Sequence, residues 1–349
     1  MSSFFAGVLL MLLTACSPPV PVTQEAYVFG TRVEVRVWGV AEQEAHAALG
    51  EVLREFDIMH KAYHAWQPSE LTALNAALGA GRPHDVSPEL AALIRNAQTL
   101  AAQGDYLFDP GIGGLVSLWG FHNDEFKAEL PDADTLARQM AAKPTIAALT
   151  VDGLRVTSKN LSVALDFGGY LKGVALDRAA NLLRARGVEH ALVNIGGNVL
   201  ALGNRDGKPG GQAWRVGIQH PRASSVGNVP LASLELRDGE AIGTSGDYHR
   251  FFELEGKRYC HLIDPRTGYP ATGAQSVTIL IPPAADTGMR SDALSKPLFI
   301  SGDGWPEMAR RLDVAFVLRV GADGTAVATP AMKQRLTIEA PGVQLKVAG

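Results

Sequence analysis

Alternating apolar and polar residues predict the strands of this chain. Val33, Val35 and Val37 alternate with charged residues, which is the period-two pattern of a strand with one buried face. Shorter apolar segments predict further strands at 146–156, 161–165, 191–195, 214–219, 231–236, 248–253, 257–263, 276–281 and 314–320. A Glu255-Gly256 turn separates two of these segments, so we expect a hairpin there. The segment 314–320 is expected to close the sheet.

Between these strands, apolar residues recur every three to four positions, as they do on one face of a helix. In the segment 41–59, the residues with this spacing are Ala45, Leu49, Leu53 and Phe56. The same spacing predicts helices over 69–78, 88–103, 132–141, 171–186, 287–300 and 306–312. Because helices and strands do not alternate strictly, the pattern favours an α+β fold with mixed, largely antiparallel sheets and flanking helices. We expect one continuous catalytic domain over 27–349.

The first residues form a separate segment. Residues 4–14 are apolar, but the run is too short to span a bilayer as a stable helix. It leads into Leu13-Thr14-Ala15-Cys16, which resembles the bacterial lipobox, where the cysteine is lipidated and becomes the mature N-terminus. We therefore expect a signal peptide over 1–15, a lipidated Cys16 with a flexible linker over 16–26, and a periplasmic domain anchored to a membrane. No Lys or Arg precedes the apolar run, unlike in most signal peptides, and an uncleaved anchor is the alternative.

Composition narrows the class of protein. Hydrophobic residues make up 46% and charged residues 19% of the chain, which is typical of a folded globular protein and excludes disorder. The net charge of −4 provides no basic field for nucleic acid. The chain has two cysteines, so a lipidated Cys16 leaves Cys260 without a partner, and we expect it to be buried and inert.

Three glycine-rich segments, 166–173, 194–198 and 243–248, are predicted to form turns at the ends of elements, where backbone amides can meet anions. In the first, Asp166 ends a strand, glycines allow a ligand to approach the backbone, and Lys172 projects from the first turn of a helix. This resembles a phosphate cradle, although it lacks the G-x-x-x-x-G-K-[ST] pattern. A capped helix with a solvated lysine explains the same residues equally well.

Two further side chains are candidates for chemistry. His261 lies on an apolar strand before an Asp-Pro turn; it is either a core residue or a group that takes a proton from a hydroxyl. Asp292 begins an Asp-Ala-Leu-Ser-Lys sequence on a predicted helix. Its carboxylate is a potential ligand for a hard cation. The alternatives are a helix cap or an i,i+4 pair with Lys296.

Taken in order, these motifs resemble the FAD:protein FMN transferase family, also called the ApbE lipoprotein family. The resemblance covers nearly the whole mature chain and rests on the segments 29–31, 64–71 with Asn75, 108–110 running to 118–121, 166–177, 194–198, 244–248, 261–270 and 292–296. It implies a two-lobed α+β domain with FAD in a cleft between the lobes. Members cleave the FAD pyrophosphate with Mg²⁺, attach FMN through a phosphoester to a Thr or Ser of an acceptor protein, and release AMP.

The resemblance also implies roles for single residues. The isoalloxazine and adenine pockets would draw on Phe29, Trp66, Leu107, Phe108 and Asp109. The nucleotide would be lined by Asp166, Lys172 and Ile263. The metal ligands would be the Gly169 carbonyl and the Asp292 carboxylate, and His261 would be the base. The acceptor would carry a Gly/Ser/Thr motif, as membrane redox subunits do.

Three positions depart from the family pattern. Phe29 stands where the family commonly has Met, and Trp66 where it usually has Tyr; both keep the apolar or flat character. Lys296 stands where the family usually has a Thr that ligates Mg²⁺. Because a protonated ammonium cannot ligate a cation, we expect reduced metal affinity, with Lys296 neutralising the pyrophosphate directly.

Two other functions fit the same motifs. One is a Mg²⁺-dependent FAD pyrophosphatase, which differs only in using water as the acceptor. The other is a non-enzymatic FAD-binding lipoprotein, which Lys296 favours. The presence of both Asp292 and His261 argues against simple binding, since a protein that only binds FAD does not require this combination of residues.

Overall fold

The computed structural model describes residues 21–123, 125–208, 210–222 and 229–348. The predicted signal peptide, Cys16 and most of the predicted linker lie outside these residues. Within them, no helix is both long enough and apolar enough to cross a membrane.

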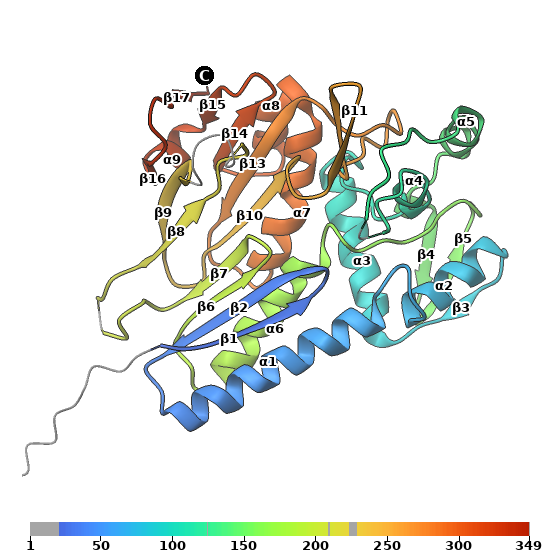
Figure 1. The fold of residues 1–349 in the computed structure, drawn as a ribbon. Coiled ribbons are helices and arrows are strands. Elements are labelled where there is room, and N and C mark those ends of the chain that lie inside the picture. Colours follow the sequence, from blue (N-terminus) through green and yellow to red (C-terminus); the bar gives the residue numbers. More distant parts are fainter. Residues whose placement is uncertain (1–20, 124, 209, 223–228, 349) are drawn as a thin grey trace, which may run out of the picture.

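The centre of the molecule is a large sheet, which has nine strands in the described part of the chain (Figure 1). Neighbouring strands are antiparallel except for the last pair, which is parallel. In spatial order the strands are β1 (Val22–Val28), β2 (Thr31–Trp38), β6 (His190–Ile195), β7 (Asn198–Leu202), β10 (Ala241–Gly246), β13 (Ala274–Ile281), β14 (Phe316–Gly321), β15 (Ala326–Ala328) and β17 (Leu345–Val347).

Both faces of this sheet are covered. One face carries helices α1 (Glu42–Ala62), α6 (Leu171–Ala185) and α7 (Thr287–Ile300), with α8 (Trp305–Arg311) against α7. The other face carries a second sheet, β16 (Leu336–Ile338), β9 (Ala232–Leu236) and β8 (Trp214–Ile218), together with α9 (Pro330–Lys333). Alternate residues of β7 point to opposite faces of the sheet: Leu200 and Leu202 pack against the helices, whereas Val199 and Ala201 pack against the second sheet.

A smaller part lies beside the sheet, on the right of Figure 1. Its helices are α2 (Glu70–Gly79), α3 (Pro88–Gln103), α4 (Gly113–Leu118) and α5 (Ala133–Ala142). Its strands form a small sheet, β3 (His84–Asp85), β5 (Arg155–Ser158) and β4 (Leu149–Asp152), and a hairpin, β11 (Phe251–Leu254) with β12 (Lys257–Cys260). Short 3-10 helices are η1 (Ile146–Ala148) and η3 (Gly302–Gly304). The architecture confirms the predicted α+β class.

The helix predictions are confirmed, and local capping explains why. Helices α3 and α7 have the predicted bounds, and the other predicted helices differ by one to three residues. Ser69 caps α2 by accepting from the Thr72 N–H, and Ser87 caps α3 by accepting from the Leu90 N–H, with Pro88 in the first turn. These helix starts are encoded locally.

Several strand predictions are corrected. Residues 161–165 form no strand; Ala164 makes only an isolated bridge to Ile112. The segment 146–156 begins as η1 and continues as two strands. β14 does not close the sheet, since β15 and β17 follow it. The segment 243–248, expected as a turn, lies largely in the central strand β10, because its glycine-rich backbone packs directly against α7. β1 begins at Val22, within the range expected for the linker.

Candidate functional site

Helices α6 and α7 cross at two glycines, and this crossing positions the centre of the candidate site. A Cβ on Gly173 would lie 2.4 Å from the Gly288 carbonyl oxygen, so only glycine allows the two backbones to approach this closely. The Asp177 carboxylate, one turn further along α6, accepts hydrogen bonds from the Gly288 and Met289 N–H groups at 2.6 and 2.8 Å. It thereby caps the first turn of α7 from another helix.

This crossing brings Asp292 of α7 against the start of α6. The Asp292 side chain is 1% exposed, and its Oδ2 accepts from the Gly173 N–H at 3.0 Å. Lys172 Nζ lies 3.8 Å from the same oxygen. The other oxygen, Oδ1, accepts from Lys296 Nζ, which also donates to the Asp292 carbonyl at 2.7 Å. Asp292 is therefore in mid-helix, and the i,i+4 pair with Lys296 is the interpretation that the structure confirms.

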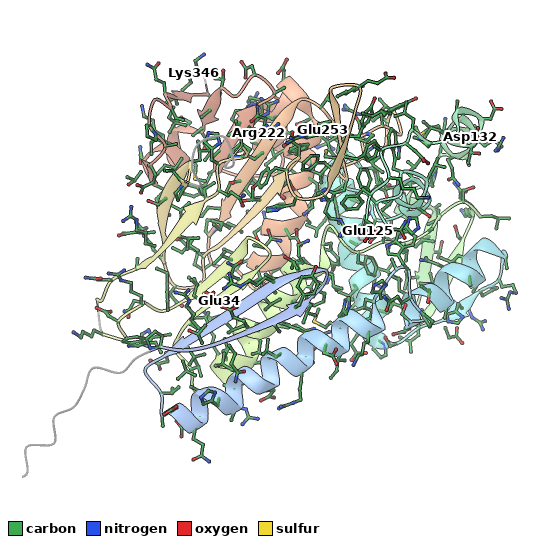
Figure 2. All side chains as sticks on the ribbon, in the orientation of Figure 1. Glu34, Glu125, Asp132, Arg222, Glu253 and Lys346 are labelled. Carbon is green, nitrogen blue, oxygen red and sulfur yellow. The ribbon has the colours of Figure 1, made fainter. Side chains whose placement is uncertain are left out.

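Charge dominates the protonation of this pair. Burial alone would raise the pKa of the Asp292 carboxyl, but Lys172 and Lys296 outweigh it and lower that pKa to about 2. Burial lowers the pKa of Lys296 to about 8, against the opposing effect of Asp292. The carboxylate and the ammonium are consequently both charged near neutral pH. Most other charged side chains lie on the surface of the molecule, as the labelled Asp132 and Lys346 do in Figure 2.

The turn before α6 provides the second group of polar atoms. Asp166 Oδ1 accepts from the Gly168 N–H at 2.8 Å, and Lys172 Nζ donates to the Gly168 carbonyl at 2.9 Å. Burial raises the pKa of Asp166, while the Gly168 N–H, Arg250 and Lys172 act in the opposite direction. Lys172 is not freely solvated, since its side chain is 23% exposed and bridges the turn to Asp292.

Gly169 connects this turn to α7 and to Phe108. A Cβ on Gly169 would lie 3.2 Å from Lys296 Cε and 3.7 Å from the Phe108 ring. The lysine stem therefore runs directly beside Gly169 on its way to Asp292. The structure thus brings Phe108, Gly169, Lys172, Asp292 and Lys296 together, as expected from the resemblance.

His261 follows β12 and faces the same group of charges. Burial, together with the nearby cations Arg250 and Lys172, lowers the pKa of His261 to about 3, so the ring is neutral at physiological pH. Its Nδ1 lies 3.2 Å from the Arg250 carbonyl oxygen. Because a carbonyl oxygen can only accept, we assign the ring proton to Nδ1, which leaves Nε2 as the unprotonated nitrogen.

Aromatic rings form one side of the site. Phe29, in the β1–β2 turn with a φ of 56°, packs against Phe56 and His60, and His60 packs against His64 at 5.1 Å between ring centroids. His64 Nδ1 accepts from the Trp66 and Gln67 N–H groups, which orients the loop that carries Trp66. Trp66 is half-buried against the His122 ring.

Three further predicted binding residues are buried in the core or tie loops together. Leu107 is buried in the main core, and Ile263 packs in an aromatic cluster with Trp119 and Tyr259. Asp109 Oδ1 accepts from the Gly111 and Ile146 N–H groups at 2.8 Å each, and so ties the loop after α3 to η1. These side chains position the loops around the site, and a contact with nucleotide stays a prediction.

Sequence reasoning missed Arg250. Its guanidinium donates to the carbonyl oxygens of Phe121 and Asn123, lies near Gly30, and influences the protonation of both Asp166 and His261. It joins the hairpin strand β11 to the loop after α4. No local pattern distinguishes this arginine from a surface residue, so only the fold reveals it. Cys260, next to His261, is buried as predicted, and burial raises the pKa of its thiol to about 12.

The residues at Asp292 do not fit a divalent cation in this arrangement. A hard cation needs several oxygen ligands with free lone pairs. Here each carboxylate oxygen already accepts from an N–H donor, and the Lys296 ammonium on Oδ1, with its stem beside Gly169, repels a second cation at this position. In the described part of the chain, no three His, Cys, Asp or Glu side chains group as a metal site would require.

Comparisons with known proteins identify the family of this chain. The family model described as ApbE family matches residues 29–318. An FAD:protein FMN transferase of Rhodobacter capsulatus is 41% identical over 93% of this chain, and the match covers 60% of that relative's own length. An FAD:protein FMN transferase of Treponema pallidum is 35% identical, over 79% of this chain and 77% of the relative.

Solved structures give the same result. The ApbE protein of Thermotoga maritima superposes with a TM-score of 0.81 at 28% identity, over 90% of this chain and 99% of that one. The flavin transferase ApbE of Vibrio cholerae superposes with a TM-score of 0.76 at 26% identity, over 91% and 100% of the two chains. With the family model, the relatives and the solved structures in agreement, this chain belongs to the ApbE family.

Proposed function

We propose that this protein is a flavin transferase, which cleaves FAD and attaches the FMN half to a Thr or Ser of an acceptor protein through a phosphoester bond, releasing AMP. The observation that carries this proposal is the convergence of Asp166, Lys172, His261 and Asp292, which come from three segments far apart in the chain. The Phe108 ring lies beside Gly169 of the same turn, and Arg250, which acts on His261, lies near Gly30, the neighbour of Phe29. The FAD:protein FMN transferase activity for which the relatives are named supports the proposal.

The charges of the site suit a pyrophosphate. Lys172, Arg250 and Lys296 all act on His261, so three cations lie around one neutral imidazole. Cations of this kind stabilise the charge of phosphate oxygens as the phosphorus is attacked. In the proposed step, the acceptor hydroxyl oxygen bonds to the phosphorus of the FMN half, and the bond from that phosphorus to the bridging oxygen breaks. AMP leaves with that oxygen.

His261 is the proposed base for the hydroxyl proton. Its Nε2 is unprotonated at neutral pH, as a base requires. A pKa of about 3 makes it a weak proton acceptor in the free protein. Binding of an anionic pyrophosphate would raise that pKa, because a nearby negative charge stabilises the imidazolium form. The base would thus be strengthened when substrate is present.

The finer assignments are also part of the proposal. We propose that Trp66 and Phe29, which are both half-buried, stack on the isoalloxazine ring. Mg²⁺ is the cofactor that the family resemblance implies, but the occupied Asp292 carboxylate favours a weak site, and no step above depends on a metal. We place the protein in the bacterial periplasm, anchored to a membrane by lipidated Cys16, where a membrane redox subunit would be within reach.

In-gel flavin fluorescence tests the transfer. The protein is co-expressed with an acceptor domain that carries a Gly/Ser/Thr motif, and the denatured acceptor is examined for covalently bound flavin. We expect a fluorescent band with the wild type, and its loss or a reduction of at least about 100-fold with His261→Ala, as for removal of a general base, and with Asp292→Ala. His46→Ala is the matched control, because His46 lies exposed on α1, and this variant should keep the band.

Other outcomes point to other functions. FMN and AMP released in solution without a labelled acceptor would identify a pyrophosphatase. FAD that stays bound and intact would identify a binding protein. Full labelling by His261→Ala would contradict the proposed role of this histidine.

A further inference from the structure

The i,i+4 pair in α7 places a lysine ammonium where a bound cation would contact Asp292. Lys296 Nζ is hydrogen-bonded to Asp292 Oδ1 and to the Asp292 carbonyl, and its stem passes within 3.2 Å of the position of a Cβ on Gly169. Lys296 thus contacts Asp292 through its ammonium and runs beside Gly169 with its stem, and these are the two residues that the family resemblance assigns to a metal.

The surroundings hold this ammonium in place. Lys296 is 9% exposed, and its neighbour Ser295 is fixed by a 2.7 Å hydrogen bond to Ser245 of β10. A Cβ on Gly243 of β10 would lie 2.0 Å from the Ser291 carbonyl, so strand and helix are in direct backbone contact at this level. The lysine cannot swing out to solvent without breaking its ion pair in a buried environment, which is costly.

We propose that Lys296 is a tethered cation that takes the place of the divalent metal, so that this chain binds no metal at Asp292 and presents the ammonium itself to the pyrophosphate. The role toward the pyrophosphate rests on the proposed function, whereas the metal-binding claim does not. A lysine carries a single charge and cannot dissociate. Transfer by this protein is consequently expected to persist when chelators remove divalent ions.

Replacing Lys296 should allow Asp292 to bind a divalent metal. Lys296→Thr removes the ammonium, frees Asp292 Oδ1 and supplies a hydroxyl oxygen, which is a suitable ligand for a hard cation. We expect a divalent site to appear in this variant. The exposed Asp57–Lys61 pair on α1 has the same i,i+4 spacing, so Lys61→Thr is a matched control.

Mn²⁺ titration of the full-length protein without flavin is the direct test, with free Mn²⁺ followed by electron paramagnetic resonance. The wild type should show no Mn²⁺ binding that depends on Asp292. Lys296→Thr is expected to bind Mn²⁺ at least on the order of 10–100-fold more tightly than any residual binding by the wild type, the range typical for gain or loss of a supporting group at a metal site. Adding Asp292→Asn to Lys296→Thr should abolish this binding. Lys61→Thr should behave as the wild type.

Two results would overturn the inference. One is Mn²⁺ binding by the wild type that Asp292→Asn removes. The other is equally weak binding by the wild type and a folded Lys296→Thr, which would mean that Lys296 does not occupy a cation's place. If Lys296→Thr does not fold, the wild type decides: inhibition of its transfer activity by EDTA, restored by Mg²⁺, contradicts the proposal, and undiminished activity supports it. Because the titration uses no flavin, its outcome is independent of whether the protein transfers FMN.

Discussion

Burial decides what a lysine–aspartate pair does in this protein. The Asp57–Lys61 and Asp292–Lys296 pairs have the same i,i+4 spacing on a helix, but the side chains of the first are 52% and 74% exposed and those of the second 1% and 11%. An exposed pair contributes little to stability because water and salt screen it. A buried pair fixes both groups in one geometry, since removal of either partner leaves a charge without compensation. Only the Asp292–Lys296 pair can therefore keep a charged group in a fixed position next to a bound ligand.

The histidine beside this pair should make stability depend on pH. The pKa of His261 is lowered to about 3 by burial and nearby cations, below the value of roughly 6.5 for an unfolded chain. The unfolded state therefore binds the proton more readily, so stability is complete above about pH 6.5 and falls as the pH drops toward 3. At pH 5 the loss attributable to His261 is about 2 kcal/mol relative to pH 8.

Urea unfolding at pH 8 and pH 5 measures this loss. His261→Gln should lose less stability between the two pH values than the wild type, by about that amount. His46→Gln, which changes an exposed histidine on α1, should follow the wild type. An equal pH dependence in the wild type and His261→Gln would show that the imidazole is not held neutral by the fold.

At the scale of elements, the site depends on how closely α6 approaches α7. Helix α7 is buried on all sides, and its two serines are satisfied within the helix: Ser291 donates to the Gly288 carbonyl and Ser295 to the Asp292 carbonyl. Asp177 of α6 caps its first turn. The two helices are thus one unit, and the carboxylate of Asp292 is aligned by the backbone of α6.

A methyl group at the crossing should separate them. In Gly173→Ala, the new Cβ would lie 2.4 Å from the Gly288 carbonyl oxygen and 2.7 Å from Asp292 Cβ, so α7 must shift away and the Gly173–Asp292 hydrogen bond is lost. We expect about 1–3 kcal/mol of destabilisation, as for overpacking of a core, together with a strong loss of transfer. Chemical denaturation and the fluorescence assay measure the two effects.

Gly50→Ala is the matched control for this substitution. Gly50 also lies within a helix, α1, but its Cβ would meet only the flexible end of Arg54 at 3.3 Å. Alanine favours helix over glycine by up to about 1 kcal/mol, so this variant should be as stable as the wild type or more so. Equal stability of the two alanine variants would contradict the importance of the close crossing.

At the scale of the molecule, the site lies where the large sheet with its helices meets the smaller part (Figure 1). Phe29 and Asp292 come from the first part, whereas Phe108 and the hairpin before His261 come from the second. Arg250, at the start of the hairpin, donates to the backbone after α4 within the smaller part, and its guanidinium lies near Gly30 in the β1–β2 turn of the first part. Relative motion of the parts would therefore change the site directly.

The proposed membrane anchor is a property of the whole molecule as well. Cys16 lies outside the described residues, and the sheet begins only six residues later, with β1 at Val22. Lipidation would therefore hold the domain close to the membrane. Cys16→Ser should move the protein from the membrane pellet to the soluble periplasmic fraction on fractionation, while the purified domain keeps its transfer activity. Retention of Cys16→Ser in the membrane would indicate an uncleaved anchor.

Features that depend on neighbouring residues can be predicted from the sequence alone. Helix bounds followed from spacing and caps such as Ser69 and Ser87, the hairpin followed from Glu255-Gly256, and the ordered motifs indicated the ApbE family. Periodicity also gave the α+β class. Each of these depends on residues a few positions apart, so no knowledge of the fold was needed.

Which side chains act together depends on contacts between distant parts of the chain. The glycines of β10 predict a turn, but they serve a close contact with α7, which lies far away in the sequence. No local pattern in the sequence marks Arg250. Asp109, predicted as a binding residue, links the loop after α3 to η1 through its carboxylate. The meaning of Lys296 likewise depended on its burial beside Gly169. Long-range packing sets burial and charge, and those quantities determine whether a lysine is a solvated surface group or part of a binding site.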